Sequence, residues 1–415
     1  MNILLLSTFE LQGGAAIACK RLQQALEKQG VSVKMLVRDK QTDDKQVYSI
    51  YEKEPKWLGK LRFLWERFVI WLHNGFSREN LFAVSIANTG YRIDRHPLVK
   101  WADIIHLHWT NQGFLSLGSI AQLSSLDKPI VWTMHDMWPF TGICHHARHC
   151  NHFMSRCSEC FFLQKKKHDL SEKKFIEKRE LIFSNSNIRL IACSHWLLKK
   201  AQSSNLSINH CILSIPNPIN ISIFKSNNKI DSRRRLGLPQ DKKMLLFGAA
   251  NLTDQRKGLS YLVDAIIKLN LLKDVCLVVF GQAKEEFISL IQIPVYSMGY
   301  LSQADDIVCL YNAVNVFITP SLEENLPNTI MEAMACGTPC VGFDVGGIPE
   351  MIDHRKNGYV AEYKNADDLA NGIRWILEEA DPETLSKDAR KKVEQSYSEE
   401  VVAKQHIALY HSLLS

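Results

Sequence analysis

The sequence has no apolar run of about 18 residues, the length at which a helix could span a membrane. It also has no recognisable secretory signal, because Met1 and Asn2 lead straight into a short apolar segment without a basic start or a cleavage site. Internal repeats and low-complexity segments are missing as well. We therefore expect a globular protein of the cytoplasm, in which the eleven cysteines are mostly free thiols.

A dinucleotide-binding fingerprint is also missing. The first glycine-rich turn, QGGAA with Gly13 and Gly14 at its centre, does not match GxGxxG, which argues against a dehydrogenase. The turn follows a strand predicted at residues 2–7 and opens a helix that is expected to end near Gln29. Backbone N–H groups at such a helix start can accept a phosphate. A tight turn that needs small residues for packing is the alternative, and both interpretations stay open.

The charge balance is mildly basic, with a net charge of +6 and a pI of about 8.6. This fits anionic small ligands or an anionic membrane surface, and we expect no nucleic-acid partner. At 415 residues, of which 46 % are hydrophobic, the chain is long enough for two to three domains with substantial cores.

Short apolar strands alternate with helical segments in both halves of the chain. This alternation predicts an α/β fold with two doubly wound, Rossmann-like domains. The segment Pro216-Asn217-Pro218 is a strong breaker, so we place the domain boundary there. The expected domains are residues 1–216 and 217–397, followed by a C-terminal helix at residues 398–415.

Residues 56–76 are rich in both apolar and basic side chains. The apolar members predict one broad helical face, made of Trp57, Leu61, Leu64, Trp65, Phe68, Ile70, Trp71 and Leu72. The positive charges are Lys56, Lys60, Arg62 and Arg67. This composition is typical of an interfacial helix on an anionic bilayer. A core-packed helix whose basic residues reach out to solvent is the alternative.

Histidines stand at the ends of two predicted strands. The strand at residues 102–108 ends in His106 and His108, and the strand at residues 129–134 is followed by His135 and Asp136. A histidine at the carboxyl end of a parallel strand is placed for chemistry. Single histidines are more often structural, but the adjacent acid and the following turn favour a functional role for His135.

Four cysteines follow within a short segment interleaved with histidines: Cys144, Cys150, Cys157 and Cys160. Such a set could hold a structural zinc ion tetrahedrally. The second pair has zinc-site spacing, whereas the first pair is wider than a second CxxC. A redox-sensitive thiol cluster and simply buried cysteines are the competing interpretations. The basic segment at residues 164–179 could contact lipid headgroups, but we favour a solvated helix face.

The most informative stretch runs from Ser321 to Gly347. It contains Glu324 and Glu332, eight residues apart, with Pro327 between them. A strand predicted at residues 316–319 places Glu324 in the loop at its carboxyl end and Glu332 about one turn inside the next helix. Ligands bind at that edge of an open α/β sheet. Two carboxylates suit a ligand rich in hydroxyls, and two solvated glutamates on a helix are the plain alternative.

Together these motifs resemble the retaining nucleotide-sugar glycosyltransferases of glycosyltransferase family 4. The resemblance covers nearly the whole length and implies the GT-B fold, in which two Rossmann-like domains face a central cleft. Its most specific part is the E-x7-E pair with the EAMAxGxP segment that follows. The other motifs are Gly13-Gly14-Ala15, Met134-His135-Asp136, Arg256-Lys257-Gly258 and Gly346-Gly347-Ile348-Pro349-Glu350. The HDMWPFTGxC segment with its cysteine-rich insert, at about residues 142–165, is similar to a subgroup of bacterial surface-polysaccharide transferases.

The resemblance implies a sugar-binding role for the residues around the glutamate pair. Glu332 would bind the ribose hydroxyls of the donor, and Glu324 would contact the hydroxyls of the transferred sugar. Asn325 and Leu326 would supply backbone contacts to the donor. His135 would line the sugar site from the other domain.

The resemblance also implies a phosphate-binding set. Lys257, with Arg256 beside it, would neutralise the diphosphate, and Gly13 and Gly14 would bring backbone N–H groups to the same phosphates. Family members often carry a further Gly-Arg pair after the first strand of the second domain. Here that stretch reads GAAN, with Asn251 where the cation is expected.

The implied mechanism is front-face displacement with retention, driven by electrostatic stabilisation of the departing diphosphate. No metal ion or other cofactor is required for such catalysis, and no DxD-type metal motif is evident. The catalytic residues under this hypothesis are Glu324, His135 and Lys257. Neither glutamate is expected to act as a covalent nucleophile.

The leading hypothesis is a glycosyltransferase located peripherally on the inner face of the cell membrane. It would move a sugar from a nucleoside-diphosphate sugar to a glycan or lipid-linked acceptor of a lipopolysaccharide, O-antigen, capsule or exopolysaccharide. The alternatives are another GT-B enzyme, such as a nucleotide-sugar epimerase, and a non-catalytic nucleotide-sugar-binding protein.

Overall fold

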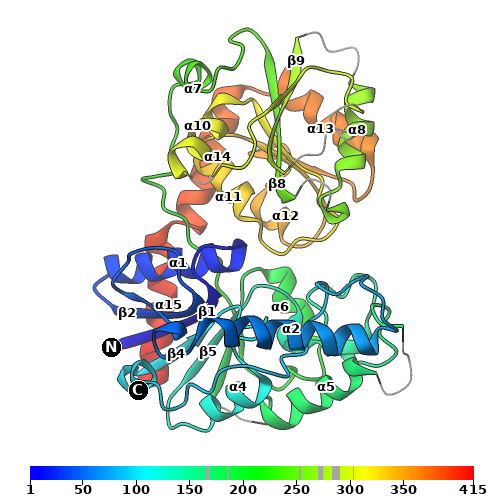
Figure 1. Ribbon diagram of the computed structural model, residues 1–415. Coiled ribbons are helices and arrows are strands. Elements are labelled where there is room, and N and C mark those ends of the chain that lie inside the picture. The colour runs from blue at the N-terminus through cyan, green and yellow to red at the C-terminus, as the bar shows by residue number, and fades with distance from the viewer. Residues whose placement is uncertain (165–168, 185–186, 252–253, 270–273, 283–289, 302) are drawn as a thin grey trace. The chain divides into compact units, whose positions relative to one another are not determined.

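The protein is described here by a computed structural model (Figure 1). It describes residues 1–164, 169–184, 187–251, 254–269, 274–282, 290–301 and 303–415. The chain forms two compact units: unit 1 consists of Met1–Pro218 with Val402–Ser415, and unit 2 of Ile219–Val401. Unit 2 is therefore inserted, in chain order, between the two segments of unit 1.

Unit 1 is built on a seven-stranded parallel sheet with the order β3-β2-β1-β4-β5-β6-β7. The strands are β1 (Asn2–Phe9), β2 (Ser32–Asp39), β3 (Val47–Ser49), β4 (Ile104–Leu107), β5 (Ile130–Met134), β6 (Ile188–Ala192) and β7 (Ile212–Ser214). The helices are α1 (Gly14–Lys28), α2 (Lys56–His73), α3 (Pro97–Trp101), α4 (Leu117–Ser124), α5 (Leu170–Leu181), α6 (His195–Gln202) and all but the first residues of α15 (Glu399–Leu414).

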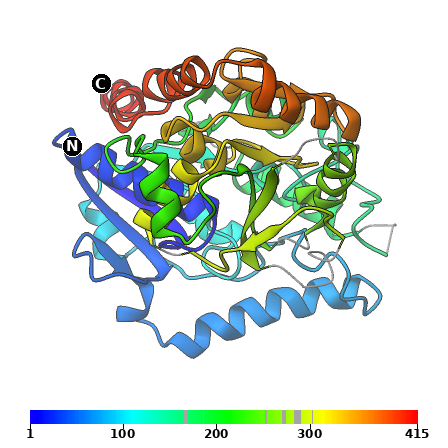
Figure 2. The same cartoon turned by 90° about the horizontal axis from the view of Figure 1, so that it is seen from above.

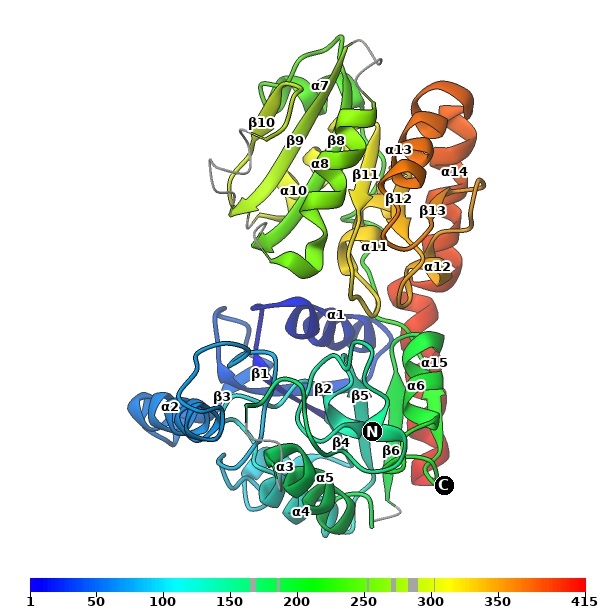
Figure 3. The ribbon, with the colours of Figure 1, turned by 90° about the vertical axis from the view of Figure 1, so that its right-hand side faces the viewer.

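The central strands of unit 1 are buried on both faces, which explains why they read as continuous apolar runs. Alternate residues of β1 belong to different cores, with Leu4 and Leu6 on one face and Ile3 and Leu5 on the other. Figures 1 and 3 show the helices of unit 1 on both sides of its sheet. The C-terminal helix α15 shares the second core with α1, because its Tyr410 is fully buried there.

Unit 2 repeats the plan with six parallel strands in the order β10-β9-β8-β11-β12-β13. The strands are β8 (Lys243–Asn251), β9 (Val275–Gln282), β10 (Val295–Ser297), β11 (Val316–Thr319), β12 (Cys340–Phe343) and β13 (Gly358–Ala361). The helices are α7 (Lys229–Arg235), α8 (Leu259–Lys268), α10 (Ala304–Ala313), α11 (Asn328–Ala335), α12 (Ile348–Met351), α13 (Ala366–Arg374) and α14 (Pro382–Ser396).

The two sheets share one consequence of their strand order. In each sheet, the first strand of the unit lies inside the sheet, with the next two strands on one side of it and the later strands on the other. The strand order therefore reverses between β1 and β4 in unit 1 and between β8 and β11 in unit 2. Loops at the carboxyl ends of these strands diverge and leave room for a ligand. The prediction of two doubly wound, Rossmann-like sheets is confirmed.

Several local predictions differ from the structure. The edge strands β3 and β10 were not predicted, because each reads Val-Tyr-Ser and neither shows a continuous apolar run. From the sequence, Arg256-Lys257-Gly258 is predicted to open a helix after the first strand of unit 2, but the helix starts at Leu259. Gly258 has a φ of +68°, a left-handed conformation that a helix interior does not accept, so the basic pair lies in a preceding 3-10 turn, η4 (Gln255–Lys257). No helix within the described ranges is both long and apolar enough to cross a membrane.

Candidate active site

The carboxyl edge of the unit 2 sheet gathers the residues expected to hold a sugar donor. Glu324 lies in the loop after β11, and Lys257 lies in η4, which follows β8. Lys257 Nζ donates a hydrogen bond to Glu324 Oε2 over 2.7 Å, with 32 % and 18 % of the two side chains exposed. A cation and a carboxylate therefore meet at the point where the strand order reverses.

Two glycines allow three loops to approach one another closely at this edge. A Cβ on Gly258 would lie 1.8 Å from the carbonyl oxygen of Pro320. Gly346 has a φ of +63°, and a Cβ there would lie 1.7 Å from the carbonyl oxygen of Glu324. Any larger residue would collide with backbone, so glycine is required at both positions. The η4 turn and the GGIPE loop are thereby held against the loop that carries Glu324.

Glu332 lies in α11 and is almost fully buried, with 8 % of the residue exposed. Tyr311, in α10, donates its hydroxyl hydrogen to Glu332 Oε2 over 3.2 Å. Burial raises the pKa of Tyr311 well above its ordinary value, and the charge of Glu332 adds to this effect. The hydroxyl therefore stays a donor, and it fixes one face of the carboxylate. No sequence signal singled out Tyr311, since α10 reads as an ordinary core helix.

The two loop residues next to Glu324 are also buried. Asn325 and Leu326 are each 6 % exposed. The carbonyl oxygen of Asn325 accepts a hydrogen bond of 2.7 Å from the backbone N–H of Gly347. The loop is thus fixed by backbone contacts on the side of the GGIPE segment.

Arg256 is paired with an acid that the sequence did not reveal as part of the site. Its Nη2 lies 2.6 Å from Asp254 Oδ2, and its Nε donates to the same carboxylate. Hydrogen bonding to Asp254 raises the pKa of Arg256. Burial raises the pKa of Asp254, but the hydrogen bonds and charge of Arg256 outweigh it and hold that pKa below its ordinary value. Both basic residues of the turn therefore face a carboxylate within their own unit.

In unit 1, histidines gather at the carboxyl ends of β4 and β5. The Nδ1 atom of His108 lies 2.9 Å from the Nε2 atom of His135, and the two rings stack with centroids 5.2 Å apart. Burial lowers the pKa of His135 to about 4, although the nearby charge of Asp136 opposes this. His135 is therefore neutral near pH 7, and its ring is oriented by His108.

Asp136 pairs with His145 rather than with His135, so the adjacent acid acts on His135 through its charge alone. Asp136 Oδ2 lies 2.7 Å from His145 Nδ1 and accepts a 3.1 Å hydrogen bond from the indole of Trp109. Neighbouring residues at a strand end point to different sides, so adjacency in sequence does not make them partners. Burial raises the pKa of Asp136, but His145 outweighs it and lowers that pKa to about 2.

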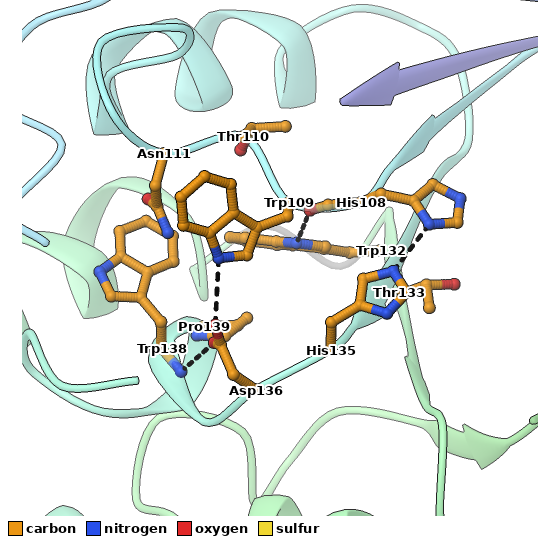
Figure 4. A pocket seen from close by; sticks show the side chains of 10 residues that line it. All are labelled: His108, Trp109, Thr110, Asn111, Trp132, Thr133, His135, Asp136, Trp138 and Pro139. Atoms are coloured by element: carbon orange, nitrogen blue, oxygen red, sulfur yellow. Dashed lines mark hydrogen bonds between the residues drawn. The ribbon is translucent and has the colours of Figure 1, made fainter. Parts of the chain in front are cut away.

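These residues line a small pocket at the end of β4 and β5 (Figure 4). It has room for about one water molecule. Three buried polar atoms on its wall have no hydrogen-bond partner among the described residues: His108 Nε2, Thr110 Oγ1 and Asn111 Oδ1. Unsatisfied donors and acceptors in a buried wall favour a polar occupant that can exchange hydrogen bonds with them.

The glycine-rich turn of unit 1 lies at the start of α1. Gly13 is the residue before the helix and has a φ of +88°, and nothing lies within 4 Å of a Cβ built on it. Packing therefore does not require a small residue at this position, whereas the positive φ favours glycine. The structure leaves the helix start without a side-chain cap or an acid in its first turn. The N–H groups in the first turn of any helix have no partner inside the helix, which is the property that phosphate binding uses.

The zinc site suggested by the cysteine spacing is not assembled in this geometry. Among the described residues, which include all four cysteines, no group of three or more His, Cys, Asp or Glu side chains could hold a metal ion. Cys144, Cys157 and Cys160 are buried free thiols in the first core of unit 1, and Cys150 packs against it. Their surroundings thus favour the interpretation as buried cysteines.

Lys178 of α5 was expected on a solvated face, and this prediction was wrong. The residue is fully buried, and its ammonium donates to the carbonyl oxygens of Trp138 and Thr141 over 2.5 and 2.9 Å. It also lies 3.7 Å from the centroid of the Trp138 ring. Burial lowers the pKa of Lys178 to about 7. Lys178 therefore holds the turn that follows His135 and Asp136. Residues 165–168 of the same basic segment lie outside the described residues.

Solved structures with the same arrangement identify the class of fold. A sucrose-phosphate synthase from Thermosynechococcus elongatus superposes with a TM-score of 0.66 at 20 % identity, covering 99 % of this chain and 98 % of that one. HepE of Anabaena, solved in complex with UDP and glucose, gives a TM-score of 0.64 at 18 % identity over 99 % of this chain and 100 % of that one. At such identities the likeness concerns the fold alone, and that fold is GT-B, as predicted.

The sequence comparison gives the family. The profile of Glycosyltransferase Family 4 matches residues 12–222, just over half of the chain, and that of Glycosyl transferases group 1 matches residues 242–379. This chain belongs to glycosyltransferase family 4.

Individual relatives match only part of the chain. An uncharacterized glycosyltransferase of Methanocaldococcus jannaschii is 30 % identical over 58 % of this chain and 64 % of its own length. The N-acetyl-alpha-D-glucosaminyl L-malate synthase of Bacillus anthracis is 25 % identical over 54 % of this chain and 59 % of its own length. In both cases the match spans less than two thirds of the relative.

Substituting Gly258 by alanine should destabilise the protein more than the same substitution at Gly237. Both glycines have left-handed φ values, +68° and +66°, but nothing lies within 4 Å of a Cβ on Gly237. We expect Gly237→Ala to lower the free energy of unfolding by about 1 kcal/mol and Gly258→Ala by at least about 2 kcal/mol. Urea unfolding followed by circular dichroism measures both. Equal losses would show that the loop relaxes away from Pro320.

The buried histidines should make unit 1 sensitive to acid. Burial lowers the pKa of His106 and His108 well below the ordinary value and that of His406 to about 3. The unfolded chain binds these protons near pH 6.5 while the folded chain does not, so stability falls as the pH drops from about 6.5 towards 4. Each histidine contributes up to about 1.4 kcal/mol per pH unit to this fall.

The variant His406→Gln isolates one of these protons. We expect it to reduce the pH dependence of the unfolding free energy by about 1.4 kcal/mol per pH unit between pH 6.5 and 4.5. His411→Gln, at an exposed position of the same helix, serves as the matched control. Tryptophan fluorescence is a suitable signal, because eight of the nine tryptophans lie in residues 1–218. The same slope in wild type and His406→Gln would contradict a neutral, buried His406.

Proposed function

We propose that this protein is a retaining, metal-independent glycosyltransferase that moves a sugar from a nucleoside-diphosphate sugar to a glycan or lipid-linked acceptor of a bacterial surface polysaccharide. The observation that carries the proposal is the ion pair of Lys257 with Glu324 at the carboxyl edge of the unit 2 sheet. A nucleoside-diphosphate sugar has its diphosphate between two hydroxyl-bearing sugars, which matches a cation paired with one carboxylate and a second, buried carboxylate, Glu332, in the following helix α11.

The pairing of Lys257 suggests how the site would respond to the donor. A diphosphate competes with Glu324 for the ammonium of Lys257, since both are anionic acceptors. Once Lys257 turns to the phosphates, the carboxylate of Glu324 is free to accept hydrogen bonds from the transferred sugar. Arg256 can add a second charge by sharing its guanidinium between Asp254 and the phosphates. The same cations then stabilise the negative charge that develops on the leaving diphosphate.

The other predicted residues take supporting roles in this proposal. Glu332, held on one side by Tyr311, is assigned to the ribose hydroxyls, and Asn325 and Leu326 to backbone contacts with the donor. In unit 1, Gly13 and Gly14 are assigned to the phosphates. His135, neutral at pH 7, is assigned to the hydroxyls of the sugar, for which an imidazole can donate and accept hydrogen bonds.

The names of several relatives support the proposed substrate class. One relative from Escherichia coli, 25 % identical over 53 % of this chain, is a UDP-Gal:alpha-D-GlcNAc-diphosphoundecaprenol alpha-1,3-galactosyltransferase. Another, from Staphylococcus aureus, is a capsular polysaccharide biosynthesis glycosyltransferase, 25 % identical over 54 % of this chain. We propose a nucleotide sugar as donor and a lipid-linked glycan as acceptor on this basis.

A panel of labelled nucleotide sugars tests the activity. We expect one of them to release free nucleoside diphosphate slowly in the absence of acceptor, through transfer to water. Donor binding without any turnover, also after addition of lipid-linked acceptors, would favour a nucleotide-sugar-binding protein. Neither binding nor turnover across the panel would sink the proposal.

The substitution Lys257→Ala should lower kcat/KM for the donor by about 10- to 150-fold, because a charge-assisted contact with a phosphate is worth about 1.5–3 kcal/mol. Lys242→Ala is the matched control. Lys242 also pairs with a carboxylate, that of Asp274, over 2.6 Å and is also 32 % exposed, but it precedes β8 at the opposite edge of the sheet. Similar effects of the two substitutions would refute the phosphate role of Lys257.

The two glutamates should fail in different ways. Glu332→Gln should weaken the binding of the nucleoside diphosphate alone by about 10-fold or more, because it removes a charged acceptor for the ribose. Glu324→Gln should leave this affinity unchanged or increase it, since it removes the competitor for Lys257, yet it should lower kcat. Isothermal titration with the diphosphate and steady-state kinetics separate the two. Unchanged diphosphate affinity in Glu332→Gln would exclude the ribose role.

A further inference from the structure

Helix α2 presents the polar pair Glu66 and Arg67 to the protein and several large apolar residues to solvent. Glu66 is fully buried, and its Oε1 accepts hydrogen bonds from the backbone N–H groups of Ile86 and Ala87 over 2.8 and 2.9 Å. Arg67, 7 % exposed, pairs with Glu66 over 3.1 Å and donates to the carbonyl oxygen of Val84 over 3.0 Å. These bonds fix which side of the helix faces unit 1.

The opposite side forms a continuous apolar surface, which we call the α2 stripe. Its residues are Trp57, Leu61, Leu64, Trp65, Phe68 and Leu72, with exposed fractions of 46–62 %. Their spacing of three, four or seven residues places them on one helical face. Ile70, predicted on this face, is 1 % exposed and lies on the protein side instead. The alternative of a core-packed helix is wrong for the stripe.

The surface continues beyond the helix. Phe76, 60 % exposed, packs against Trp71 with ring centroids 4.8 Å apart, and Phe82, 68 % exposed, packs against Phe63. Of the twenty large hydrophobic residues that are exposed in the described part of the chain, eight lie between residues 57 and 82. Scattered exposed apolar residues are normal, but such a concentration marks an interaction surface.

The charges of α2 favour an anionic partner. Lys56 and Lys60 are exposed, whereas Glu66, the one acid of the helix, is buried on the protein side. Arg62 is partly buried, with its guanidinium 3.8 Å from the centroid of the Tyr91 ring. In the flanking segments, exposed Lys53 and Arg78 are balanced by exposed Glu52 and Glu79, and Glu54 is partly buried. The exposed positive charge at the stripe therefore comes from Lys56 and Lys60.

The position of α2 suits a broad, flat partner. Figure 2 shows the helix running along the outside of unit 1, and Figure 3 shows it end-on beyond β3, away from the rest of the sheet. Its 18 residues span about 27 Å, so its whole length can contact one plane. Tryptophans together with lysines are typical of helices that lie in the interface between headgroups and acyl chains.

We propose that the α2 stripe, with Lys56 and Lys60, is a docking surface for an anionic lipid bilayer. The helix lies parallel to the bilayer, with the stripe among the upper acyl chains and the lysines at the headgroups. Glu66 and Arg67 keep the stripe turned outward. If the function proposed above holds, this docking brings unit 1 to the membrane in which a lipid-linked acceptor resides, but the docking surface itself does not depend on that function.

Sedimentation with vesicles tests the proposal without any sugar donor or acceptor. We expect the wild-type protein to bind vesicles of phosphatidylcholine with phosphatidylglycerol, and to bind pure phosphatidylcholine more weakly. Trp65→Glu/Phe68→Glu should lower the partition onto anionic vesicles by about tenfold or more. Lys56→Gln/Lys60→Gln should lower it by about tenfold or more on anionic vesicles, with little effect on neutral ones.

A matched control is available on the same unit. Ile208 is 59 % exposed, close to the 55 % of Trp65, but lies outside the stripe, so Ile208→Glu should bind vesicles like wild type. Circular dichroism confirms that each variant is folded. Equal vesicle binding by wild type and Trp65→Glu/Phe68→Glu would overturn the proposal. A second outcome would also overturn it: the wild-type protein does not bind vesicles but self-associates, whereas Trp65→Glu/Phe68→Glu is monomeric in analytical ultracentrifugation. The stripe would then be a contact between copies of the chain.

Discussion

Backbone packing at Gly258 and Gly346 is the constraint on which the carboxyl edge of the unit 2 sheet depends. Three loops that are separated in sequence meet there, and they approach so closely at the two glycines that no Cβ fits between them. Where the loops are in contact, Lys257 has Glu324, 67 residues further along the chain, within hydrogen-bond distance, whereas Arg256 pairs with Asp254 inside its own turn. The close backbone contact is therefore accompanied by an ion pair between distant segments of the chain.

Unit 1 buries several histidine rings in an apolar core, where the ring nitrogens need hydrogen-bond partners. Both ring nitrogens of His106 have such a partner: Nδ1 forms a 2.7 Å hydrogen bond with the hydroxyl of Tyr410, and Nε2 forms one of 2.7 Å with the hydroxyl of Thr133. His108, nearer to the strand end, is less completely satisfied, and the pocket beside it retains three atoms without a partner among the described residues. Along β4, the hydrogen-bonding groups inside the core have partners, whereas some of those near the strand end lack them. A ligand can bind at that end of the strand.

Much of the fold could be predicted from the sequence, because buried parallel strands read as apolar runs bounded by turns. The strand Val316–Thr319 was predicted to the residue for this reason. The edge strands β3 and β10 were missed, since each reads Val-Tyr-Ser and shows no continuous apolar run. Within the site, the E-x7-E pair and the basic turn were visible as motifs, but their partners Asp254 and Tyr311 were not.

The errors share a physical origin, in that sequence spacing does not report the direction of a side chain. Asp136 follows His135 yet pairs with His145, and Ile70 fits the apolar spacing of α2 yet faces the protein. Lys178 has the sequence context of a surface residue, but two carbonyl oxygens and an indole ring inside the core accept its charge.

The return of the chain to unit 1 has a consequence for its synthesis on the ribosome. Helix α15 supplies Val402, Ala403 and Tyr410 to the core that α1 also covers, and the chain reaches them only after all of unit 2. The sheet of unit 1 can thus emerge first but must wait, with one face incompletely covered, until the last helix arrives. Unit 2 is continuous and can close its own core earlier. The part of the chain that is made first is therefore the part that is finished last, and a nascent chain stalled within unit 2 would expose an unfinished face to chaperones.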